Sequence, residues 1–232
     1  SYQSLILLYL TMGLGIMLTR TLSTPKSMNY WVLRNGVRYL FLAAGGMAIY
    51  YLLNKIFQDI SGSYSAYLNN FLNLDRIIEN PLSAFRQIVS EAGRVYFGSP
   101  YYFGASIGLA PLILLVSTLT TLNTAAAKNK LITIFIWLLV LATPFLLHVL
   151  AGANGVPMRT MISLAYVAWL MTFLLLTTAQ GFSAAVCAPL VIVYSMQLLN
   201  LNSQYIASAT LTQKHDELLA ADIYRRIGEI DK

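Results

Sequence analysis

The chain has 232 residues, of which 57% are hydrophobic and only 10% are charged, and its formal net charge is +6. Soluble domains carry about 25% charged residues, so this composition excludes an ordinary soluble domain and favours an integral membrane protein. The nine acidic residues agree, because all of them lie within residues 59–91 and 216–231. The single cysteine, Cys187, excludes an internal disulfide, and the sequence contains no familiar metal-binding or nucleotide-binding motif.

Apolar blocks of about 17 to 22 residues recur along the chain, and each is long enough to cross a hydrocarbon core as a helix. The sequence therefore predicts an all-α fold, a polytopic membrane helix bundle of about six transmembrane helices with amphipathic interfacial helices on the outer face. Closely spaced glycines in the first two spans (Gly13, Gly15, Gly45 and Gly46) could mark tight helix packing. The predicted spans cover residues 2–18, 37–53, 101–122, 131–150, 161–178 and 184–201.

Basic residues predict which side of the membrane each loop faces, because they concentrate on the cytoplasmic side. Two loops that we expect on one side carry six basic residues and no acid: Arg20, Lys26, Arg34, Arg38, Lys128 and Lys130. The other nine basic residues share the opposite side with all nine acids. The net charge of +6 is therefore an orientation signal rather than a sign of nucleic-acid binding, and both termini are expected outside.

The predicted organisation is a transmembrane bundle over residues 1–201, with an outer loop at 54–100, followed by an outer helical tail at 202–232. Ser1 directly precedes a hydrophobic block without a leader, so we expect the chain to be the carboxy-terminal part of a longer protein. The missing amino-terminal part would then be a partner of this one. In the tail, Asp216–Ile230 has an apolar face at helical spacing.

The outer loop contains a strong signal for an amphipathic helix. Asn80-Pro81 combines a capping residue with proline at the first helical position, and Gly98-Ser99-Pro100 would end the helix. Apolar residues recur at helical spacing after Pro81, and we expect the opposite, polar face to carry Gln87, Ser90, Glu91 and Arg94. A second, shorter helix is plausible over residues 64–74. The segment either covers the bundle surface or forms a lid where a lipid-linked substrate meets water.

The turn between the fourth and fifth spans carries Arg159, the one charged residue between Lys130 and Lys214. A guanidinium beside the first turn of a helix is a suitable receptor for a phosphate. The alternative is that Arg159 only extends towards lipid headgroups. His148, at the outer end of the fourth span, is expected to serve packing rather than this site.

Three segments, residues 94–100, 156–159 and 216–230, together resemble the bacterial and phage-type O-antigen glucosyltransferases, the glucosyl transferase II group. The resemblance implies a GT-C-like enzyme of the bacterial inner membrane that modifies lipopolysaccharide. Such an enzyme takes glucose from an undecaprenyl or similar polyprenyl phosphate and adds it to a glycan acceptor on the periplasmic side. In that class the catalytic carboxylate commonly lies in the first outer loop of the full protein. This chain would then supply the carrier site and the lid, with no cofactor beyond the lipid-phosphate sugar donor.

Sugar transfer from a lipid phosphate needs positive charge on the departing phosphate and a base for the acceptor hydroxyl. For the phosphate we expect Arg159 first and Arg94 second. If the base lies within this chain, four carboxylates on the outer side are unranked candidates: Asp59, Asp75, Glu79 and Glu91. Acceptor sugar would contact Tyr96, Tyr102 and Asp222. Two other readings stay open, a transporter or flippase for a lipid-linked sugar and a non-catalytic membrane subunit.

Overall fold

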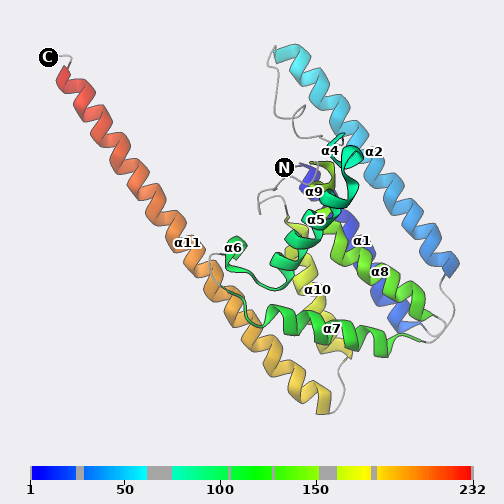
Figure 1. Cartoon of the computed structure of the whole chain (residues 1–232). Helices are drawn as coiled ribbons and strands as arrows, with labels where there is room; N and C mark the ends of the chain where they lie inside the picture. Colours follow the sequence, from blue (N-terminus) through cyan, green and yellow to red (C-terminus); the bar gives the residue numbers. More distant parts are fainter. Residues whose placement is uncertain are drawn as a thin grey trace.

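A computed structural model describes residues 2–24, 29–61, 75–103, 106–126, 129–151, 161–178 and 182–230. Within these residues the secondary structure is helical, without a strand, as predicted (Figure 1). The predicted helix at residues 64–74 lies outside the described part. The elements are α1 (Tyr2–Ser23), α2 (Asn29–Ser61), α4 (Asp75–Glu79), α5 (Pro81–Tyr96), α6 (Pro100–Phe103), α7 (Ala110–Thr124), α8 (Lys130–Ala142), the 3₁₀ turn η2 (Thr143–Phe145), α9 (Leu146–Leu150), α10 (Ser163–Thr178) and α11 (Phe182–Ile230).

Each of the six predicted spans corresponds to helix in the structure. Four stretches are long and apolar enough to cross a membrane: residues 4–23, 30–60, 130–149 and 184–224. The other two helices, α7 and α10, are apolar but have only 15 and 16 residues. A hydrocarbon core of about 30 Å needs about 20 helical residues, so α7 and the described part of α10 are shorter than a full crossing.

The predicted span at residues 101–122 is wrong at its beginning. The chain forms the short helix α6, and the membrane helix α7 begins only at Ala110. The reason is a tight turn after α5, in which Gly98 adopts a left-handed conformation with a φ of 65°. The carbonyl of Gly98 accepts a 3.0 Å hydrogen bond from the Ile107 N–H, which holds the end of α5 against the start of α7.

The last helix differs from the prediction of a span followed by a separate tail helix. α11 runs without a break from Phe182 to Ile230, through the boundary expected at residue 201. Its first half packs against α7 and α10, and Cys187 is buried there as expected. Its second half extends away from the other described helices (Figure 1). At about 1.5 Å per residue, a helix of 49 residues is far longer than a membrane is thick.

Helix α1 lies at the centre of the packing, against α2, α8 and α10. The glycines of α1 permit this, because a Cβ at Gly13 would lie 3.1 Å from the Tyr39 ring, and one at Gly15 would collide with the Tyr166 hydroxyl. Tight packing is thus confirmed for these two glycines, whereas Gly45 has open space around it. The core also contains one polar link between spans, a 3.0 Å hydrogen bond donated by the Trp137 indole to the Thr118 hydroxyl.

Helix α5 begins as the sequence predicts, since the Asn80 side chain accepts a 3.2 Å hydrogen bond from the Ser83 N–H. Figure 1 shows α5 crossing at an angle to α1, α2 and α8. Its buried residues are Ala84, Glu91 and Val95, so the expectation that Glu91 lies on the exposed polar face is wrong. The face of α5 that packs against the bundle is therefore partly polar. Other apolar residues of α5 stay exposed and available to lipid: Leu82, Phe85 and Val89.

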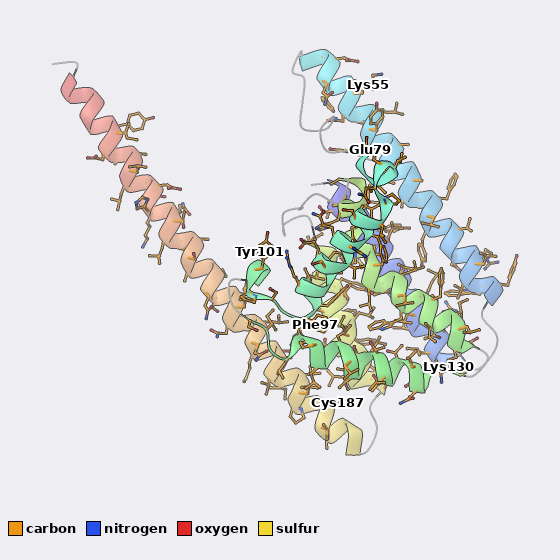
Figure 2. The ribbon with its side chains drawn as sticks, in the orientation of Figure 1. Lys55, Glu79, Phe97, Tyr101, Lys130 and Cys187 are labelled. Atoms are coloured by element: carbon orange, nitrogen blue, oxygen red, sulfur yellow. The ribbon has the colours of Figure 1, made fainter. Side chains whose placement is uncertain are left out.

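The charged residues that Figure 2 labels lie at opposite ends of the long helices, and this agrees with the orientation predicted from the basic residues. Figure 2 shows Lys55 and Glu79 towards one end of the long helices and Lys130 towards the other. Glu79 and Lys130 are both exposed.

We therefore expect Glu79 and Lys130 to face opposite sides of the membrane. In a chain whose one native cysteine is removed by C187S, E79C should react with a membrane-impermeant maleimide added to intact spheroplasts. K130C should react only after the membrane is permeabilised, and the C187S chain alone should not react. Labelling of both positions from outside would contradict the predicted topology.

The turn at Gly98 should be intolerant of a side chain. In G98A the new Cβ would collide with the Ile107 carbonyl, and alanine at positive φ adds about 1–2 kcal/mol of strain. The apparent unfolding temperature of the purified protein in detergent should therefore fall. G36A is the matched control, because no atom lies within 4 Å of the Cβ it adds to α2. Equal unfolding temperatures for the two variants would show that the turn is not under this constraint.

Candidate functional site

Helix α5 carries an ion pair in which the carboxylate, but not the guanidinium, is shielded from water. Arg94 Nη1 lies 3.2 Å from Glu91 Oε1, one helical turn away. Only 11% of the Glu91 side chain is exposed, against 47% of the Arg94 side chain. The Arg94 guanidinium also lies 5.1 Å from the centre of the Tyr101 ring in α6. The pair thus presents a half-exposed cation above a nearly buried carboxylate.

Tyr96 ties the end of α5 to the kinked helix that follows α8. Its hydroxyl donates a 2.6 Å hydrogen bond to the carbonyl of Leu141. That carbonyl lies next to the 3₁₀ turn η2, where Pro144 lacks an N–H and the regular helical hydrogen bonds are interrupted. Burial raises the pKa of the Tyr96 phenol, which keeps the hydroxyl protonated as a donor. Its ring meets Phe145 edge to face at 5.6 Å.

His148 in α9 completes this junction. The residue is fully buried, and its ring centre lies 5.8 Å from that of Phe145. Neither ring nitrogen has a hydrogen-bond partner within the described part of the chain. Helix α9 packs against α5, the helix that carries Glu91 and Arg94.

An apolar cavity of about 500 Å³ begins immediately beyond this cluster. Val95 and Tyr96, the two residues after Arg94, line one end of it, and α7, α10 and α11 supply the other walls. Their contributions include Leu114 of α7 and Leu164 and Trp169 of α10. None of the described residues that line the cavity is charged. An uncharged pocket of this size between membrane helices suits a hydrocarbon chain.

The structure separates the four candidate carboxylates. Asp59 and Glu79 are exposed on α2 and α4, whereas Glu91 is buried beside Arg94. Asp75 begins α4, and its side chain lies outside the described part. Glu91 is thus the candidate that the described residues bring into a cluster.

The other predicted site residues divide in the same way. Tyr96 lines the cavity, and Arg94 lies two residues before it in α5, paired with Glu91. Asp222 lies on the part of α11 that extends away from the bundle (Figure 1), so it is not brought to the cluster. Tyr102 belongs to α6 without a described side chain, and Arg159 falls outside the described residues. Figure 2 labels Phe97, which directly follows α5, and Tyr101, which lies in α6. Both side chains are exposed.

The sequence predicts a packing role for His148, and its full burial against the Phe145 ring agrees. The contact of α9 with α5 could not be foreseen, because Glu91 of α5 and His148 of α9 are 57 positions apart and the contact is a tertiary one. Among the described residues, no three His, Cys, Asp or Glu side chains come together as a metal site would require.

Comparison with known families gives a decisive match. The model of the family described as Glucosyl transferase GtrII matches residues 1–176, which is most of the chain. The chain belongs to this family. Membership in the GtrII family gives it a glucosyltransferase role, and the matched region contains Glu91, Arg94, Tyr96 and His148. No curated protein and no solved structure matches the chain significantly.

The Tyr96 hydroxyl should contribute measurably to the stability of this GtrII family member. Y96F removes the donor to Leu141 while keeping the ring, so we expect a loss of about 1 kcal/mol in unfolding free energy. The matched control is Y30F, because Tyr30 is highly exposed on α2 and should tolerate the change. Thermal unfolding in detergent compares the two, and a Y96F protein as stable as Y30F would refute the contribution.

Proposed function

We propose that this protein transfers glucose from a polyprenyl phosphate carrier to a glycan, such as O-antigen, on the periplasmic side of the bacterial inner membrane. The observation that carries the proposal is that α5 carries the cation Arg94 directly before Val95 and Tyr96, which line the uncharged cavity together with residues of α7, α10 and α11. A lipid-linked sugar phosphate has the same order of parts, with a long apolar chain that ends in an anion.

The proposed binding mode follows from this match. The prenyl chain occupies the cavity between the membrane helices, and its burial supplies affinity in proportion to the apolar area covered. The phosphate lies against Arg94, whose half-exposed guanidinium is held in place by Glu91 and the Tyr101 ring. Arg159, the first candidate for the phosphate from the sequence, stays a prediction, because it belongs to the turn before α10 and lies outside the described residues.

The chemical requirement is stabilisation of the departing phosphate. As the bond between the sugar C1 and the phosphate oxygen breaks, negative charge grows on that oxygen, and a fixed cation lowers the barrier. The exposed apolar residues of α5 would keep the helix at the membrane boundary, where carrier and acceptor meet. A glycan acceptor in the aqueous periplasm then reaches the sugar from the outer side.

The test measures transfer of radiolabelled glucose from polyprenyl phosphate to acceptor in proteoliposomes. R94Q removes the charge without shortening the side chain greatly, and losing a charged hydrogen bond costs about 1.5–3 kcal/mol. We expect the KM for the donor to rise roughly tenfold to a hundredfold. R86Q is the matched control, since Arg86 is exposed on the same helix.

Three outcomes separate the alternatives. An unchanged donor KM in R94Q would remove Arg94 from the phosphate site. Movement of the labelled carrier across the vesicle membrane without transfer would favour a flippase. Absence of both activities in the wild-type protein would leave the proposed donor without support.

A further inference from the structure

Three apolar helices end around a second pocket, which the proposed glucosyl transfer does not use. This pocket has a volume of about 580 Å³ and lies between α1, α7 and α10. Its lining includes Arg20 in the last turn of α1, Thr124 at the end of α7 and Thr177 in the last turn of α10. It shares none of its described lining residues with the apolar cavity next to α5.

Arg20 brings a positive charge into this pocket. Its guanidinium lies 4.8 Å from the centre of the Trp31 ring of α2, and a guanidinium above an aromatic ring still presents the N–H groups at its edge to oxygen acceptors. Helices α1, α7 and α10 contain no aspartate or glutamate, and none of the described residues that line the pocket is acidic. The pocket therefore suits an anion that the protein itself does not supply.

The beginning of α8 adds positive charge at the same end of the bundle. The Asn129 side chain donates a 2.9 Å hydrogen bond to the Thr24 carbonyl and a 3.4 Å hydrogen bond to the Thr21 carbonyl. These bonds hold the beginning of α8 against the end of α1, so the exposed Lys130 lies at the same end as Arg20 (Figure 2). In the orientation predicted from the basic residues, this end faces the cytoplasmic leaflet.

The hydroxyl groups in the pocket can accept hydrogen bonds from a ligand. Those of Thr19, Ser23 and Thr177 donate their own protons to carbonyls of their own helices, at 3.0, 3.2 and 2.8 Å respectively. A hydroxyl oxygen has two lone pairs besides its proton, so each oxygen keeps the capacity to accept. A ligand that carries hydroxyl donors beside its negative charge would match this lining.

The pocket changes from polar to apolar with distance from the helix ends. Ile16 and Phe173 line it about one helical turn before Arg20 and Thr177, and both apolar side chains are exposed. A phospholipid has the same order of parts, with a phosphate at the membrane boundary and acyl chains that extend inwards. Contact of those chains with the exposed apolar residues is favourable because it removes apolar surface from water.

We propose that this pocket binds a phosphatidylglycerol molecule of the surrounding membrane. Arg20 binds the phosphodiester, the hydroxyl oxygens of Thr19 and Thr177 accept hydrogen bonds from the glycerol headgroup, and the acyl chains lie along Ile16 and Phe173. Basic pockets between membrane helices on the cytoplasmic side bind anionic lipid headgroups. A choline headgroup would instead place a second cation near Arg20 without a carboxylate to balance it, so a zwitterionic lipid binds less tightly.

The proposal goes beyond the proposed glucosyl transfer and does not depend on it. A lipid in this pocket touches the ends of α1, α7 and α10 together. Because it binds the folded bundle and not the unfolded chain, it raises the free energy of unfolding as its concentration increases.

The experiment measures lipid binding to the purified full-length protein in detergent, by native mass spectrometry and by unfolding temperature. Dioleoyl phosphatidylglycerol should be retained and should raise the unfolding temperature, whereas the same amount of dioleoyl phosphatidylcholine should do neither. R20Q removes the positive charge, so its affinity for phosphatidylglycerol should fall about tenfold or more. R38Q is the matched control, because Arg38 is an exposed arginine of α2 that does not line the pocket.

The double variant T19V/T177V tests the hydroxyl groups separately, since valine keeps the branched shape of threonine. Its affinity for phosphatidylglycerol should fall about threefold to tenfold. Phosphatidic acid has no glycerol headgroup, so its binding should change little in this variant. Equal losses for the two lipids would remove the hydroxyl groups from the site.

If R20Q does not accumulate in the membrane, R20K serves instead, because lysine keeps the charge but lacks the planar guanidinium, and its affinity should still fall measurably. Wild-type affinity in the Arg20 variant overturns the proposal, as does equal retention of the two dioleoyl lipids by the wild-type protein. A loss in R38Q as large as that in R20Q would show a diffuse attraction to surface charge rather than a site. Displacement of phosphatidylglycerol by an equimolar amount of polyprenyl phosphate would assign the pocket to the carrier and also overturn the proposal.

Discussion

The cost of holding a charge away from water governs the arrangement of this molecule. It confines the carboxylates to two segments and places Lys55 and Glu79 at the end of the helices opposite to Lys130 (Figure 2). Against this background Glu91 is an exception that the fold sustains through Arg94 and the shielded surface of α9. The exception lies about one helical turn before Val95 and Tyr96, which line the apolar cavity.

The junction of α5 with the helix formed by α8, η2 and α9 is what brings this chemistry together. The 3₁₀ turn around Pro144 leaves irregular hydrogen bonding in the span, and the Tyr96 hydroxyl bonds to the carbonyl beside it. The left-handed turn at Gly98 then directs the chain back towards α7, so that α5 closes one end of the cavity. These few contacts thus fix the position of the Glu91–Arg94 pair relative to the apolar cavity.

Local sequence signals predicted the individual elements well. Asn80-Pro81 marked the start of α5, Gly98-Ser99-Pro100 its end, and apolar length the membrane-spanning helices. These signals did not predict which face of α5 packs against the bundle. The periodicity of α5 placed Glu91 on the polar side, but the bundle packs against the boundary between the two faces and leaves Leu82, Phe85 and Val89 outside. In a soluble protein those apolar side chains would be buried first, whereas next to a membrane lipid covers them at little cost.

The sequence by itself determined that the chain is a helical membrane protein, which segments are apolar enough to lie in a membrane, and which residues are chemically able to serve a sugar-phosphate site. Those properties depend on composition and on spacing along one helix, which are local. Only the tertiary structure decided that Glu91, rather than Asp59 or Glu79, is buried, and that α7, α10 and α11 leave an apolar cavity lined also by Val95 and Tyr96 of α5. These depend on contacts between residues far apart in the chain, for which neither hydropathy nor periodicity carries a signal.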